Sequence, residues 1–134
     1  MRWKSSNGNY SSGPNQNVTD ILFTALVNGL QGFNGSELRI TGHSLGNQLA
    51  LSISAQLINN NSFRPDRVAL LDPFYSNGAE SYYGGKWAGD IARDNLAIIK
   101  SAGVAVEAYR SSPVTSTLFV GDQNKALMNE VAFV

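Results

Sequence analysis

The chain has 134 residues with ten basic and ten acidic side chains, so its formal net charge is zero. This balance argues against a nucleic-acid-binding protein, because such a protein needs a basic surface that neutralises phosphates. The 43% of apolar residues is typical of a globular domain rather than of a disordered chain. The sequence contains no cysteine, which excludes disulfides, thiol catalysis and cysteine-ligated metal sites.

The N-terminal part of the chain differs in composition from the rest. Residues 1–16 are rich in Ser, Asn and Gly and are expected to form an irregular arm before a single domain over residues 17–134. The first residues contain no hydrophobic segment of the signal-peptide kind, and no apolar run in the chain is long enough to span a bilayer. We therefore expect no transmembrane segment. Four Asn-X-Ser/Thr sequons are only weak evidence for secretion, because this composition produces them by chance; they begin at Asn9, Asn17, Asn34 and Asn60.

Three segments have the periodicity of helices. The first begins at Asn17, a suitable N-cap, and its apolar residues fall on one face: Val18, Ile21, Leu22, Ala25, Leu26, Gly29 and Leu30. The second covers residues 45–58, where apolar positions leave only a narrow polar stripe, so we expect burial on more than one side. The third covers residues 90–102 and ends at Gly103.

Short strands are predicted between and after these helices. Residues 38–41 and 104–109 have strand character, and residues 117–120 form a further candidate. Residues 67–71 are a continuous apolar run, which is typical of a strand buried on both faces. Residues 121–134 are ambiguous. The alternation of helix and strand predicts an α/β fold with a mainly parallel sheet and flanking helices.

One motif carries chemical information. Residues 42–46, Gly-His-Ser-Leu-Gly, match the Gly-X-Ser-X-Gly nucleophile elbow and lie between a predicted strand and a predicted helix. A sharp strand-to-helix turn exposes the Ser44 hydroxyl, and the glycines on either side avoid collisions of Cβ atoms with the strand and helix. The Leu45 amide at the helix N-terminus can then donate to a developing oxyanion. The motif makes Ser44 the candidate nucleophile, with an ordinary glycine-rich turn as the alternative.

The same region resembles a known family. Residues 40–46 resemble the elbow of α/β-hydrolase lipases, and residues 67–73 resemble the strand and Leu-Asp-Pro signature of the pancreatic-type lipases. The resemblance implies a partial α/β-hydrolase fold, hydrolysis of acylglycerols or other carboxylic esters without cofactor or metal, and export from the cell. It also implies that Asp72 is the triad acid. Asn47 departs from the family pattern, which usually has a small residue there.

Asp72 is a suitable acid on physical grounds as well, because parallel sheets place active sites at the carboxyl ends of their strands. The alternative for Asp72 is a strand-end carboxylate that caps the following turn. Asp122, which follows the strand candidate at 117–120, is the second candidate acid.

A catalytic base is not evident. A serine hydroxyl needs a base, which in this fold is a histidine later in the chain than the nucleophile and the acid. The only histidine is His43, and the turn should direct its side chain away from Ser44. Lys100 and Lys125 are conceivable substitutes that nothing in the sequence places near Ser44. We therefore expect little or no esterase activity. On this reading, the sequence is either a part of a longer lipase-like chain or a naturally truncated, non-catalytic relative.

The sequence also leaves other functions open. Aromatic residues among glycines at 74–87 would, by resemblance, border the acyl pocket or contact a lipid interface, whereas an ordinary surface loop fits equally well. A catalytically inactive lipase-like module would bind lipid or a partner and would be prone to self-association through exposed sheet edges. An acyltransferase or thioesterase would use the same elbow with another acceptor or ester.

Overall fold

The computed structural model describes residues 16–44, 46–73, 88–109 and 132–133. Helices and strands alternate along the described chain as α1 (Gln16–Leu30), β1 (Arg39–His43), α2 (Gly46–Asn59), β2 (Arg67–Leu71), α3 (Ala88–Ser101), β3 (Ala105–Tyr109) and β4 (Ala132–Phe133). The predicted α/β fold is confirmed. The strand candidate at 117–120 lies outside the described residues, and β4 falls in the segment that the sequence left ambiguous.

The four strands form one parallel sheet in the order β1-β2-β3-β4. Across this sheet, His43 pairs with Leu71 and Leu71 pairs with Tyr109. The connections from β1 to β2 and from β2 to β3 each contain a helix, as parallel neighbours require. Because the strands run in one direction, their carboxyl ends lie along the same edge of the sheet.

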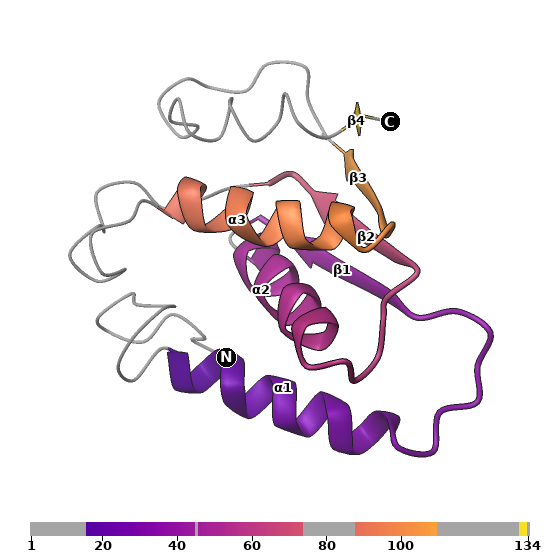
Figure 1. The fold of residues 1–134 in the computed structure, drawn as a ribbon. Coiled ribbons are helices and arrows are strands. Elements are labelled where there is room, and N and C mark those ends of the chain that lie inside the picture. Colours follow the sequence, from indigo (N-terminus) through magenta and orange to yellow (C-terminus); the bar gives the residue numbers. More distant parts are fainter. Residues whose placement is uncertain (1–15, 45, 74–87, 110–131, 134) are drawn as a thin grey trace.

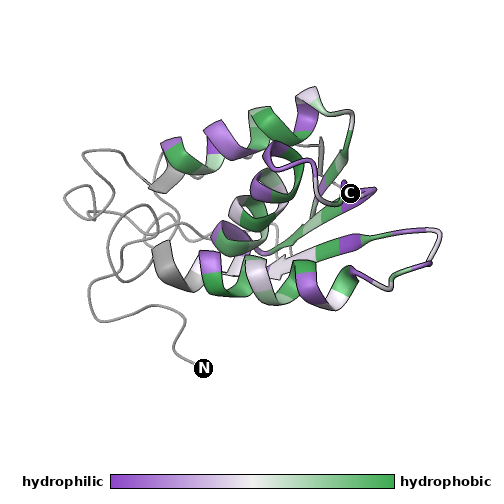
Figure 2. Cartoon of the chain, turned by 60° about the horizontal axis from the view of Figure 1, so that its bottom comes forward, coloured by the Kyte–Doolittle hydropathy of each residue, from purple (hydrophilic) through white to green (hydrophobic). Residues whose placement is uncertain are grey.

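Helices α2 and α3 pack together on one face of the sheet, and α2 lies between α1 and α3 (Figure 1). Helix α2 contacts β1, β2 and both other helices, so its expected burial on more than one side is confirmed. Figure 2 shows hydrophobic and hydrophilic residues alternating along the helices, which is the pattern of elements with one buried face. The core between helices and sheet consists of Leu51, Ala55, Val68, Leu70, Ala92, Leu96, Ile99, Val104 and Ala108.

Strand β2 differs from the sequence prediction. Val68 and Leu70 are buried, but Arg67, Ala69 and Leu71 are only half-buried. The prediction of a strand buried on both faces is therefore wrong for the described chain. The reason is that α2 and α3, the described helices that pack on the sheet, lie on one face of it, so side chains alternate between the core and the other face.

Helix α1 also differs in detail from the prediction. It begins one residue before Asn17, which therefore lies in the first turn rather than at the N-cap. The predicted apolar face is partly wrong, since Ile21 is 66% exposed and Ala25 is exposed, whereas Thr19 is 1% exposed. Among the described elements, helix α1 packs mainly against α2. The residues of α1 that face α2 are therefore the ones that become buried.

The ends of α2 and α3 have the same backbone geometry. After α3, Gly103 has a φ of 73° and the Val104 amide donates to the Ile99 carbonyl over 3.2 Å. This bond and the left-handed residue define a Schellman motif, which confirms Gly103 as the end of the helix. Helix α2 ends in the same way at Asn61, whose φ is 49°.

Strand β1 and helix α2 meet at Gly42. A Cβ atom on Gly42 would lie 2.8 Å from the Asn47 Cα and 2.9 Å from the Ala50 Cβ. Among the described residues, a Cβ on Gly46 would meet nothing within 4 Å. The expectation that the glycines of the motif avoid Cβ collisions is therefore confirmed for Gly42, whereas no described residue would collide with a Cβ on Gly46.

This difference gives a matched pair of variants. We predict that Gly42→Ala lowers the free energy of unfolding by about 1–3 kcal/mol, because the added methyl group pushes α2 away from β1. Gly46→Ala should leave the free energy of unfolding unchanged or raise it, because alanine favours the helix that begins at this residue. Urea unfolding monitored by circular dichroism measures the free energy of unfolding of both variants. Equal losses in the two variants would contradict the role assigned to Gly42.

Candidate functional site

Ser44 and Asp72 lie side by side at the carboxyl edge of the sheet. Ser44 directly follows β1 and Asp72 directly follows β2. Because His43 and Leu71 are paired in the register, the next residues of the two strands are neighbours. The structure therefore places the two candidate residues, which are 28 positions apart in the sequence, at adjacent strand ends. Both residues are half-buried.

Ser44 and Asp72 also share an unusual backbone conformation. The φ of Ser44 is 52° and that of Asp72 is 42°, both in the left-handed region that non-glycine residues rarely adopt. Such a conformation costs about 1–3 kcal/mol per residue and is concentrated at functional sites. The third non-glycine residue with a positive φ in the described chain, Asn61, ends a helix. The positive φ of Ser44 agrees with the strained strand-to-helix turn that the elbow motif predicts.

Asn47 connects the turn at Ser44 to β2. Its Nδ2 donates to the Ser44 carbonyl over 2.6 Å and to the Leu71 carbonyl over 3.0 Å. The Ser44 amide itself donates to the Leu71 carbonyl over 2.9 Å. Sequence reasoning treated Asn47 only as a departure from the lipase pattern and missed this role. The sequence feature that could have indicated this role is an amide side chain in the first turn of a helix that was expected to be buried.

Asn47 is fully buried, at 0% exposure, and its Oδ1 has no hydrogen-bond partner among the described residues. A buried unpaired amide oxygen costs about 1–3 kcal/mol. The donor end of the side chain is thus used twice while its acceptor end is left unpaired.

Asp72 is held from its other side by β3. The Asp72 amide donates to the Tyr109 carbonyl over 2.8 Å, which continues the ladder between β2 and β3 beyond the last strand residue. The two site residues are therefore tied by backbone hydrogen bonds across three adjacent strands.

The described residues do not bring a base to Ser44. His43 is exposed, and it alternates with Gly42, which faces α2. Its side chain therefore lies on the sheet face away from α2. Lys100 is in the last turn of α3, five positions before β3 begins, and so lies near the amino ends of the strands. Four of the predicted site residues and segments fall outside the described residues: Leu45, residues 74–87, Asp122 and Lys125.

Within residues 16–44, 46–73, 88–109 and 132–133, no group of three or more His, Cys, Asp or Glu side chains could hold a metal ion. None of the helices in this part of the chain has the length and apolar character of a membrane span.

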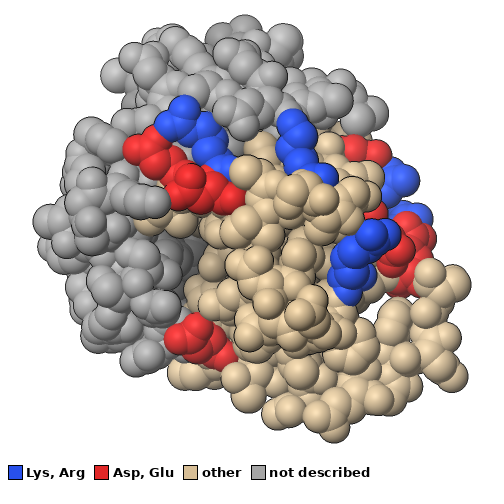
Figure 3. Space-filling model, viewed as in Figure 1, with Lys and Arg blue, Asp and Glu red and all other residues tan. Residues whose placement is uncertain are grey.

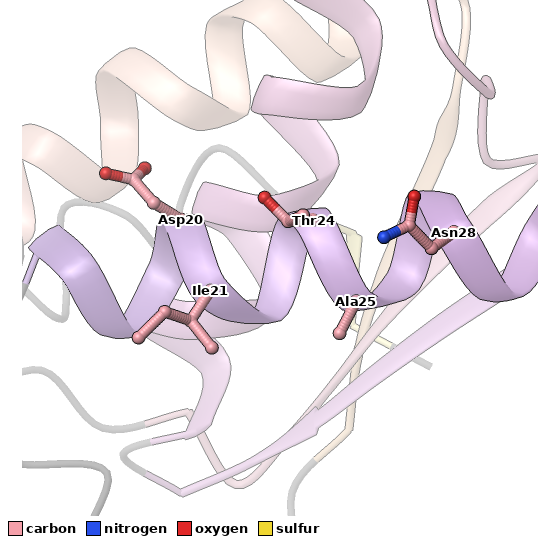
Figure 4. A pocket seen from close by; sticks show the side chains of 5 residues that line it. All are labelled: Asp20, Ile21, Thr24, Ala25 and Asn28. Carbon is pink, nitrogen blue, oxygen red and sulfur yellow. The ribbon is translucent and has the colours of Figure 1, made fainter.

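A pocket of about 520 Å³ lies against the exposed side of α1. Figure 4 shows its described lining residues, in which Ile21 and Ala25 point to one side of the helix and Asp20 and Thr24 to the other. The described part of this pocket wall includes neither Ser44 nor Asp72. We therefore do not assign this pocket to the candidate catalytic site.

A polar cluster lies on the sheet face away from α2 and α3. The Glu107 carboxylate accepts hydrogen bonds from the Tyr109 hydroxyl over 2.7 Å and from the Arg67 guanidinium over 2.5 Å. The bond from Tyr109, followed by that from Arg67, lowers the pKa of Glu107. The same bond to Glu107 raises the pKa of Tyr109. Figure 3 shows acidic and basic side chains next to each other elsewhere on the surface as well.

Comparison of this chain with protein-family models, with curated proteins and with solved structures gives no match.

The backbone strain at Ser44 gives a prediction about stability. We expect Ser44→Gly to raise the free energy of unfolding by about 1 kcal/mol, because glycine adopts a positive φ without steric cost. Ser44→Ala is the matched control, since it removes the same hydroxyl but keeps the Cβ atom that causes the strain. Denaturant unfolding measures the free energy of unfolding of the two variants. A Ser44→Gly variant no more stable than Ser44→Ala would contradict strain at this residue.

The cluster around Glu107 gives a prediction about pH. Since the folded state lowers the pKa of Glu107 below its usual 4.5, its stabilising contribution is present above that value and is lost as the pH falls through the lowered pKa. Since the folded state raises the pKa of Tyr109 above 10.0, its contribution is present below that value and is lost as the pH rises through the raised pKa. We expect Tyr109→Phe to weaken the acid dependence and to remove this alkaline dependence in unfolding experiments across pH. A Tyr109→Phe profile that coincides with that of the parent chain would show that the hydrogen bond does not form in solution.

Proposed function

We propose that this chain carries the nucleophile and the acid of an α/β-hydrolase of the lipase and carboxylesterase type. The observation that carries the proposal is the pair of neighbouring strand ends at which Ser44 and Asp72 both have a positive φ. A plain glycine-rich turn is expected to place one of its glycines, rather than Ser44, at the residue with a positive φ.

The order of elements supports the same assignment. In the pancreatic-type lipases that the sequence resembles, the acid follows the strand after the elbow helix, and β2 is that strand here. The close approach of β1 and α2 at Gly42 supports the elbow, since the family motif has a glycine at this position for the same steric reason.

The proposed chemistry is acyl transfer. Ser44 Oγ attacks the carbonyl carbon of an ester, and its proton passes to an imidazole that Asp72 orients. The Leu45 amide donates to the oxyanion, the alcohol leaves with the proton from the imidazolium, and water then hydrolyses the acyl-serine. Acylglycerols and other carboxylic esters are the proposed substrates.

The imidazole in this scheme is not His43, because its side chain lies on the sheet face away from α2. The sequence contains no second histidine. The scheme therefore predicts that the unaided chain reacts slowly and that added imidazole substitutes for the missing base.

The test uses a fluorophosphonate probe on the purified chain. Ser44 Oγ forms a bond to phosphorus, the P–F bond breaks, fluoride leaves, and the proton passes to the imidazole. We expect background labelling in buffer alone and faster labelling of the peptide that contains Ser44 when excess imidazole is added. Mass spectrometry of the digested protein locates the label.

Two variants serve as controls for this experiment. Ser44→Ala should abolish the imidazole-dependent labelling, and Asp72→Asn should reduce it, because the added imidazole loses the carboxylate that orients it. Imidazole-dependent labelling that persists in Ser44→Ala, or a Ser44 that does not respond to imidazole, would contradict the proposed function.

A second candidate is a non-catalytic interaction module. The observation in its favour is that β1 lies at an edge of the described sheet and therefore has one side without a neighbouring described strand. Under this alternative, Ser44 does not respond to imidazole and the chain self-associates with increasing concentration in analytical ultracentrifugation.

A further inference from the structure

The side chain of Asn47 does more than satisfy buried carbonyl groups. The Ser44 carbonyl already accepts a hydrogen bond from the Asn47 backbone amide over 3.1 Å, and the Leu71 carbonyl already accepts one from the Ser44 amide over 2.9 Å. The two bonds from Asn47 Nδ2 are therefore second bonds to carbonyls that have partners without it. Their effect is to join two backbone segments rather than to compensate for burial.

The segments that Asn47 joins are those that carry the two proposed catalytic groups. One carbonyl belongs to Ser44 and the other to Leu71, the residue that immediately precedes Asp72. The Ser44 amide closes the arrangement, since it donates to the same Leu71 carbonyl. Hydrogen bonds around the Asn47 side chain thus join the turn at Ser44, helix α2 and the end of β2 into one unit.

The chemistry of this position requires a short side chain with two donors on one atom, which the amide of Asn47 provides. Two carbonyl oxygens converge on one atom of the side chain, so that atom has to carry two N–H donors. The reversed amide would place Oδ1 against both carbonyls, and a carboxylate has no donor at all. A small residue, as in the lipases that the sequence resembles, would leave the turn and β2 joined by backbone bonds alone.

We propose that Asn47 is a positioning residue that sets the placement of Ser44 relative to Asp72. The inference depends on the proposed function, since it concerns the geometry of that nucleophile and that acid. An imidazole has to reach both groups at once, and a displacement of about 1 Å between catalytic groups can reduce a rate by about a hundredfold. Asn47 acts on the reaction through the two backbone segments and touches no substrate.

The test is a double-mutant cycle on imidazole-dependent labelling of Ser44. Asn47→Leu keeps the branched shape of the side chain in a somewhat larger volume and removes the donors. We expect it to slow labelling about tenfold in the parent chain, and to cause no further loss in an Asp72→Asn background. A merely structural role would give the same fold-loss in both backgrounds, and that result would overturn the proposal.

The neighbouring residue provides a matched control. Gln48 is also a buried amide in the first turn of α2, at 8% exposure, and its Nε2 has no hydrogen-bond partner among the described residues. Gln48→Leu should therefore leave the labelling rate unchanged. A loss equal to that of Asn47→Leu would assign the effect to packing of α2 and would overturn the proposal.

Amide hydrogen exchange separates this inference from the proposed function. In Asn47→Leu we expect faster exchange at the Ser44 amide, whereas the Asp66 amide should be unchanged because it donates to the Leu38 carbonyl at the other end of the same strand pair. Unchanged exchange at Ser44 would overturn the proposal whatever the labelling shows. A Ser44 that is never labelled, together with faster exchange in Asn47→Leu, would overturn the proposed function while leaving the link itself established.

Discussion

The close contact between β1 and α2 at Gly42 is the constraint on which the rest of the site depends. Because no side chain separates the strand from the helix there, the chain has to reverse within a few residues between His43 and Gly46. A turn this short places Ser44 in the left-handed region. The same approach brings Asn47, in the first turn of α2, within hydrogen-bonding distance of both strand ends.

The strain at the site is offset by hydrogen bonds between strands. The Ser44 amide is held by Leu71 of β2, and the Asp72 amide is held by Tyr109 of β3. Each strained residue is thus fixed by the next strand in the sheet, so the geometry of the site depends on the register of three strands together. This arrangement agrees with the general observation that unfavourable backbone conformations persist only where the surrounding structure determines them.

The two faces of the described sheet have different physical characters. One face packs its aliphatic side chains against α2 and α3, while the other carries the cluster of Arg67, Glu107 and Tyr109. Parallel sheets are ordinarily covered on both faces. The apolar run of β2 therefore gave a misleading prediction, since the run alone does not show which of its residues face a helix.

The sequence by itself determined the alternation of helices and strands, the elbow motif and the candidate pair Ser44 and Asp72. These features follow from local rules: hydrophobic periodicity, glycine at a close approach, and a carboxylate after an apolar strand. Only the tertiary structure decided that the two residues follow adjacent strand ends, that Gly42 lies against α2, and that Asn47 joins the two strand ends. Those results depend on strand register and helix placement, which are set by contacts between segments far apart in the chain.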